Sequence, residues 1–210
     1  MRFNSFLSKI SHYKTAKLGG LEAQFKLAPE LRTRFNDEII ATRNPKKAGV
    51  LALFYPNEQG ETIFLLTERA SYNGTHSAQI SFPGGKFERE DRILQNTALR
   101  ESFEEVGIMK NDVRIFKEMS NVYIPPSNFL VTPFLGFINK KPLFKVNHEV
   151  ESIIEVSLSD LMNESFQSTT KITTSYATDW EVPCFLFNNY IIWGATAMML
   201  SEIKELFKNK

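Results

Sequence analysis

The sequence of 210 residues has little cysteine and little histidine. Its one cysteine, Cys184, cannot form an internal disulfide, and the lack of a disulfide framework is typical of a reducing compartment. Cys184 stands in an apolar run, residues 182–187, so we expect a small buried hydrophobe and not a nucleophile. His12 and His148 have no His or Cys at metal-ligand spacing, which argues against a zinc site.

The sequence also lacks a strong net charge and long apolar runs. A net charge of +1 gives no electrostatic reason to expect binding to nucleic acid or to a membrane surface. Every uninterrupted apolar run is far shorter than the about 20 residues that span a bilayer. Residues 1–7 carry positive charge without the apolar core of a signal peptide. We therefore expect a cytoplasmic protein with no membrane and no nucleic-acid partner.

Apolar side chains make up 42% of the chain, and its 18 phenylalanines indicate a well-packed core in one compact domain. We predict a helical extension over residues 1–45, packed on a domain of residues 46–210, with the break at Asn44-Pro45. Strands are expected at residues 48–55, 62–67, 113–116, 122–124, 129–137 and 153–156, a hairpin over 171–190, and helices over 97–106, 158–162 and 194–207. Helices around mixed strands predict an α/β or α+β fold, with a mixed β-sheet between helices.

The segment of residues 84–107 carries the clearest chemical signal. On a helix, Glu104 and Glu105 lie about −60° and about +40° from Glu101, so three carboxylates share one face. The opposite face is predicted to be a core-facing stripe of Leu99, Phe103 and Val106. Clustered carboxylates suit a hard cation such as Mg²⁺ or Mn²⁺, and the competing interpretation is a solvated acidic helix face.

The spacing of these residues resembles the signature of the Nudix hydrolases. The matching positions are Gly85, Arg100, Glu101, Glu104, Glu105, Gly107 and Ile108. Three positions depart from the pattern: Asp91 replaces a glutamate, one extra residue separates it from Arg100, and Ser102 stands at an apolar site. The resemblance implies an α/β/α sandwich and a metal-dependent hydrolase of pyrophosphate linkages, binding Mg²⁺ or Mn²⁺.

The resemblance also implies roles for single residues. Metal ligands would be Glu101, Glu104, Glu105 and the Gly85 carbonyl, while Arg100 would fix a carboxylate through a salt bridge. Candidate substrate-binding residues are Arg69, Phe82, Gly84 and Gly85, with Phe82 also shaping the loop. The general base is left open between a glutamate of the signature and Glu149. Asp91 is interpreted either as a partner of these residues or as a helix N-terminal acid.

Segments outside the signature resemble coenzyme A pyrophosphatases within that family; they are residues 65–70, 79–85, 123–127, 129–134, 149–150 and 193–197. This similarity implies hydrolysis of coenzyme A or acyl-coenzyme A to a phosphopantetheine product and 3′,5′-ADP. Gly74 and Ala78 replace an expected Arg and Gly, so another nucleoside diphosphate derivative (ADP-ribose, NADH or a nucleotide) stays open. His76 in the same loop is interpreted as exposed or substrate-facing. A non-catalytic binding module is a third hypothesis, against which the complete set of carboxylates argues. The oligomeric state stays open, a homodimer included.

Overall fold

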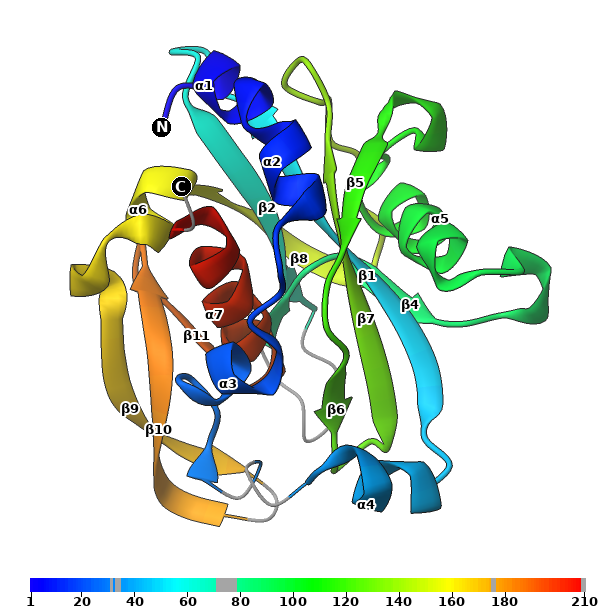
Figure 1. Cartoon of the computed structure of the whole chain (residues 1–210), viewed down its shortest axis with the longest axis vertical. Coiled ribbons are helices and arrows are strands. Elements are labelled where there is room, and N and C mark those ends of the chain that lie inside the picture. The colour runs from blue at the N-terminus through cyan, green and yellow to red at the C-terminus, as the bar shows by residue number, and fades with distance from the viewer. Residues whose placement is uncertain (31, 33–34, 71–78, 175–176, 209–210) are drawn as a thin grey trace.

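The computed structural model describes residues 1–30, 32, 35–70, 79–174 and 177–208 (Figure 1). Its α-helices are α1 (Phe3–Ser8), α2 (Ile10–Thr15), α3 (Gly20–Phe25), α4 (Asp37–Thr42), α5 (Leu94–Val106), α6 (Leu158–Met162) and α7 (Gly194–Lys208). Short 3₁₀ turns are η2 (Arg89–Asp91), η3 (Lys110–Asp112) and η4 (Glu164–Phe166). Among these residues no helix is long and apolar enough to cross a membrane.

The strands form one large mixed sheet and one small antiparallel sheet. They are β1 (Lys46–Pro56), β2 (Thr62–Arg69), β3 (Ile80–Ser81), β4 (Gly84–Lys86), β5 (Arg114–Glu118), β6 (Val122–Ile124), β7 (Phe129–Phe137), β8 (Val150–Ser157), β9 (Gln167–Thr174), β10 (Ala177–Phe187) and β11 (Tyr190–Trp193). The large sheet has the order β3-β2-β1-β7-β5, with β4 on β1, β6 on β7 and β8 on β2. β1 and β7 are parallel, whereas β2 is antiparallel to β1, which confirms the predicted mixed sheet and the first hairpin.

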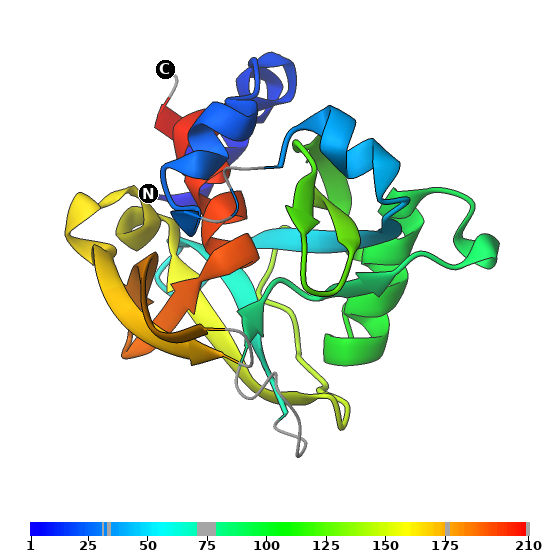
Figure 2. The same ribbon diagram turned by 90° about the horizontal axis from the view of Figure 1, so that it is seen from below.

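The sheet separates two helical layers, as the side chains of β1 show. Leu53 and Tyr55 belong to the apolar cluster on the α5 side. Ala52 and Phe54 belong to the larger cluster that contains the apolar face of α7. Successive side chains of a strand point to opposite faces, so β1 serves both layers. Figure 2 shows α5 on one side of the sheet and α7 with the N-terminal helices on the other, which confirms the α/β/α arrangement.

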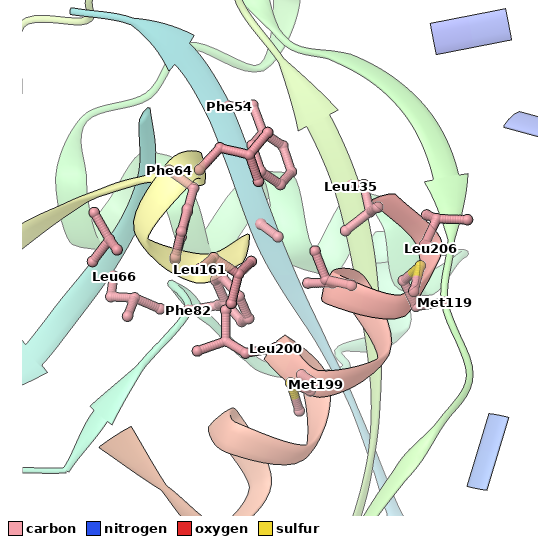
Figure 3. Packing of buried hydrophobic residues seen from close by; sticks show 14 of the residues in the cluster. Phe54, Phe64, Leu66, Phe82, Met119, Leu135, Leu161, Met199, Leu200 and Leu206 are labelled. Atoms are coloured by element: carbon pink, nitrogen blue, oxygen red, sulfur yellow. The ribbon is translucent and has the colours of Figure 1, made fainter. Parts of the chain in front are cut away.

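The larger cluster, part of which is drawn in Figure 3, is rich in aromatic rings. Phe6 of α1 lies 5.2 Å from Phe54, measured between ring centroids, and Tyr13 of α2 lies 4.6 Å from Phe207 of α7. Aromatic pairs at these distances stabilise a core beyond the burial of their area. The first two helices are therefore integral to the packing of the large sheet.

Two details of the predicted elements changed. The helical extension predicted over residues 1–45 is divided into short helices, since α3, for example, ends at Phe25. The hairpin predicted over residues 171–190 is present as β9 and β10, and β11 follows it as a third strand. Asn188 and Asn189 form the turn between β10 and β11, with positive φ of 48° and 70°, as a type I′ turn requires.

Candidate active site

Helix α5 carries the three signature glutamates and lies close to β1. The helix begins three residues before the predicted start and ends as predicted, at Gly107, which has a left-handed φ of 77°. Its first turn touches the strand at Gly49, where a Cβ atom would lie 2.5 Å from the carbonyl oxygen of Leu94. Only a glycine at this position of β1 permits so close an approach.

This close approach corrects the predicted orientation of the helix. The buried face consists of Ala98, Ser102 and Val106, together with Thr97, so small side chains face the sheet. Phe103 was predicted to be buried and is 45% exposed, so that part of the prediction was wrong. The Ser102 hydroxyl donates to the carbonyl of Ala98 at 2.7 Å, which satisfies its polar atom inside the interface.

The corrected orientation turns two glutamates toward the glycine turn of β4. The backbone N–H of Gly84 donates to Oε2 of Glu105 at 3.0 Å. A Cβ atom on Gly85 would lie 2.5 Å from the carboxylate carbon of Glu101. Gly84 has φ of 153°, a conformation that favours glycine. The Gly84-Gly85 pair therefore gives the carboxylates room and supplies one backbone donor.

Arg100 links the glutamates of α5 to the segment that precedes the helix. Its Nη1 atom lies 2.9 Å from Oε1 of Glu101 and 3.0 Å from Oε2 of Glu104. Its Nε atom lies 2.9 Å from Oδ1 of Asp91, and Nη2 donates to the carbonyl of Lys86 at 3.1 Å. The planar guanidinium matches several oxygen acceptors at once, which a lysine ammonium does not. Arg100 thus fixes the α5 carboxylates relative to β4.

Asp91 is the buried counter-charge of Arg100. Its carboxylate also accepts hydrogen bonds from the Thr97 hydroxyl at 2.8 Å and from the Glu88 N–H at 3.0 Å. The Arg100 hydrogen bonds, with those of Glu88 and Thr97, lower the pKa of Asp91 to about 2. Of the two roles expected for Asp91, the geometry favours the partner of the site residues.

Arg69, at the end of β2, and Glu149, just before β8, are near enough to Glu105 to affect its pKa. Arg69 Nη2 lies 3.7 Å from Oε2 of Glu149, and both side chains are partly exposed. Burial, helped by the charges of Glu101 and Glu149, raises the pKa of Glu105 to about 7, although the Gly84 N–H and Arg69 act to lower it. Burial also raises the pKa of Glu101. The carboxylates of Glu101, Glu105 and Glu149 and the guanidinium of Arg69 therefore interact electrostatically.

The comparisons with known proteins decide the family. A model described as "NUDIX domain" matches residues 45–172, more than half of the chain. The chain belongs to the Nudix family. The "Uncharacterized Nudix hydrolase NudL" of Yersinia pestis is 30% identical over 146 residues, which cover 69% of this chain and 72% of that protein. The protein is thus a hydrolase of pyrophosphate linkages, from a family that acts on small nucleoside diphosphate derivatives and generally uses divalent metals.

Solved structures share the fold. A MutT/nudix family protein from Enterococcus faecalis superposes with a TM-score of 0.53 at 15% identity, covering 96% of this chain and 74% of that chain. The binary complex of the C. elegans Ap4A hydrolase has a TM-score of 0.46 at 22% identity, covering 56% of this chain and 83% of that chain. The first likeness supports the mixed α+β architecture of the Nudix fold and nothing finer.

The Nudix carboxylates have the chemistry of a hard-cation site. Glu101 and Glu105 are partly buried carboxylates that interact electrostatically, and burial is the main cause of their raised pKa values. Such oxygen donors suit Mg²⁺ or Mn²⁺. Within the described part of the chain, no three acidic, His or Cys side chains are grouped as a metal cluster, and Glu104 is turned to Arg100. The metal ligands predicted from the sequence therefore stay a prediction, and the oxygen donors present are of the kind that Mg²⁺ or Mn²⁺ binds.

Phe82 has a different place from the substrate contact predicted for it. The side chain is 2% exposed, and its ring lies 6.4 Å from that of Phe64. Figure 3 shows Phe82 in the apolar cluster that also contains Leu66 and Leu200. Its side chain therefore anchors the start of the glycine turn in the core. This burial agrees with the predicted loop-shaping role of Phe82 and not with a side-chain contact to substrate. The subgroup positions 74, 76 and 78 lie outside the described residues.

Two residues near the site were missed by sequence reasoning. Gly49 has no motif that would single it out, since its importance lies in a contact between distant segments. Asn147 accepts a hydrogen bond through Oδ1 from the backbone N–H of Glu149 at 2.9 Å. An asparagine two residues before the bonded amide is the pattern of an Asx turn, so this signal was present in the sequence.

A separate cavity of about 340 Å³ lies between the N-terminal segment and the β6–β7 hairpin. Phe25, Phe35, Tyr123, Leu130 and Met198 contribute to its walls. The Nudix carboxylates do not line it, so this cavity is distinct from the candidate site at α5, β4 and Glu149.

Proposed function

We propose that this Nudix hydrolase cleaves the pyrophosphate linkage of coenzyme A or acyl-coenzyme A, yielding a phosphopantetheine product and 3′,5′-ADP. The observation that carries the reaction type is the placement of Glu101 and Glu105 at the Gly84-Gly85 turn, with Glu149 near enough to act on Glu105 electrostatically. The choice of coenzyme A rests on the resemblance of several segments outside the Nudix signature to coenzyme A pyrophosphatases. The proposed setting is the cytoplasm, and the proposed partner is this small-molecule substrate.

The proposed ligands of Mg²⁺ or Mn²⁺ are Glu101, Glu104, Glu105 and the Gly85 carbonyl. When bound, a divalent cation neutralises phosphate charge and lowers the pKa of a water molecule. The raised pKa of Glu105 supports this assignment, because a buried carboxylate near like charges is stabilised by a cation. For Glu104 to contribute, its carboxylate must turn from Arg100, to which it is 3.0 Å distant.

The remaining residues bind, orient and move a proton. Arg100 holds Glu101 in place, and the Gly84 N–H orients Glu105. Arg69 is 62% exposed, so its guanidinium is accessible to a substrate phosphate. We assign Glu149 as the general base: its carboxylate accepts the proton of the attacking water. Its position beside Glu105, at an exposed edge of the site, supports this role.

A second candidate substrate is another nucleoside diphosphate derivative, such as ADP-ribose, NADH or a nucleotide. Gly74 and Ala78 favour this alternative, because an expected arginine that would bind a phosphate bidentately is missing. We further propose that residues 1–45 are an extension of a domain formed by residues 46–210. The packing of Phe6 and Tyr13 into the core supports an extension that is firmly attached.

A substrate panel tests the proposal. The purified protein with Mg²⁺ is incubated with coenzyme A, acetyl-coenzyme A, ADP-ribose, NADH and nucleoside triphosphates, and products are identified by mass spectrometry. We expect fastest turnover of a coenzyme A compound, with 3′,5′-ADP as a product. Rapid turnover of another compound without turnover of coenzyme A would refute the substrate assignment.

Matched variants test the site itself. Glu101→Gln and Glu105→Gln should lower kcat by at least about 100-fold, because each loses a charged oxygen ligand. Glu118→Gln, an exposed glutamate on β5, should retain full activity. Unchanged turnover in both α5 variants would refute the assignment of these carboxylates.

A further inference from the structure

The chain between β7 and β8 delivers Glu149 to the active site. Two residues of this connection are bonded to the end of α5. The backbone N–H of Lys145 donates to the carbonyl of Val106, and that of Asn147 donates to the carbonyl of Glu105, both at 3.0 Å. The connection is therefore bonded to Glu105, the residue of α5 that also carries one of the site carboxylates.

Glu149 is held through its backbone on both sides. Its N–H donates to Oδ1 of Asn147 at 2.9 Å, and its carbonyl accepts from the N–H of Ala70 at 2.9 Å. The side chain of Glu149 is 45% exposed and pairs with Arg69 at a long 3.7 Å. A partly exposed side chain with so loose an ion pair gains little positional restraint from it. The main restraint on the place of Glu149 is therefore its backbone, which fixes the point from which the side chain extends.

We propose that Asn147 is a positioning residue for hydrolysis, acting through Glu149. Its amide oxygen closes the turn that carries Glu149, while its own N–H fixes the turn to the carbonyl of Glu105 on α5. The proposal rests on the assigned role of Glu149 as general base. Asn147 itself is placed behind the reacting groups, so its loss should change the rate of the chemical step more than substrate affinity.

Three variants test the proposal at position 147 and at a matched site. In Asn147→Ala the side-chain acceptor is lost, and kcat should fall about tenfold, with KM within about twofold, because small misplacements of catalytic groups have large effects. In Asn147→Ser a hydroxyl accepts the same bond more weakly, so kcat should be intermediate. The control is Asn163→Ala, which removes an equivalent turn, Oδ1 of Asn163 to the N–H of Ser165 at 3.0 Å, and should keep full kcat.

A double variant separates positioning from general loss of structure. In the Glu149→Gln background, adding Asn147→Ala should cause no further fall in kcat, since the group that it positions no longer acts as a base. A full additional fall in that background would refute the proposal. So would an Asn147→Ala variant whose kcat equals that of Asn163→Ala.

The same set of variants distinguishes this inference from the proposed function. If Glu149→Gln retains the wild-type kcat, the base assignment fails and the role of Asn147 fails with it. If Glu149→Gln is impaired and Asn147→Ala is not, only the inference on Asn147 is refuted. The midpoint of thermal unfolding should shift equally in Asn147→Ala and Asn163→Ala. An activity loss that Asn147→Ser does not partly restore would also count against the positioning role.

Discussion

Replacing Asp91 by asparagine removes the buried charge that faces Arg100. The carboxylate has 4% side-chain exposure, so solvent screens its interaction with the guanidinium very little. Its pKa is lowered from 3.8 to about 2, by close to two units, chiefly through the Arg100 hydrogen bonds. At about 1.4 kcal/mol per unit, the folded state gains about 2 kcal/mol from this carboxylate at neutral pH. We expect Asp91→Asn to lose stability of that order.

The sign of the pH dependence follows from the lowered pKa. A group whose pKa is lower in the folded state stabilises the protein above its unfolded pKa, and this contribution disappears as pH falls through the folded pKa. For Asp91 the window extends from about pH 4 down to about pH 2. The stability difference between wild type and Asp91→Asn should therefore shrink from about 2 kcal/mol at pH 7 to about 1 kcal/mol at pH 3.

Urea unfolding of wild type and Asp91→Asn at both pH values measures this difference. Asp112→Asn is the matched control, because Asp112 is an exposed acid in η3 and should change stability by less than about 0.5 kcal/mol. The reasoning is refuted if Asp91→Asn costs no more than the control at pH 7. A cost that stays constant between the two pH values would show that the lost negative charge is not responsible.

Three further predictions concern packing and metal binding. Gly49→Ala should lower the free energy of unfolding by about 1–3 kcal/mol, because the new methyl group would lie 2.5 Å from the Leu94 carbonyl oxygen. If urea unfolding shows that this variant is as stable as the wild type, the close approach of α5 to β1 is contradicted. Phe82→Ala should lower the free energy of unfolding by about 3–5 kcal/mol because Phe82 is buried, whereas Phe103→Ala, at an exposed position, should lower it by less than about 0.5 kcal/mol. Equal losses in the two variants would contradict the observed burial of the two rings. Mg²⁺ affinity measured by calorimetry should weaken from about pH 8 to about pH 6, because Glu105, with its pKa of about 7, becomes protonated. The Glu105→Gln variant should show a smaller dependence of affinity on pH. A wild-type affinity that does not change with pH would exclude Glu105 as a ligand.

Much of the local structure was predictable because it depends on residues close together in the chain. The ranges of β6, β7 and α6 match those predicted from apolar patterning, and Gly107 ends α5 as its left-handed conformation requires. The orientation of α5 was not predictable in the same way. A helical wheel assumes that the largest apolar residues face the sheet, whereas the approach at Gly49 admits only small ones and leaves Phe103 exposed.

The sequence by itself determined the three glutamates on one helix, the glycine turn before them, and the resemblance to the Nudix signature. These features are encoded locally, in the spacing of residues 84–107. Only the tertiary structure decided that Arg100 pairs with Asp91, that Arg69 pairs with Glu149, and that the Asn147 N–H is bonded to the Glu105 carbonyl. The physical reason is that Arg69 comes from the end of β2 and Glu149 from the connection to β8. Their pairing in one sheet depends on contacts across about 80 residues of chain.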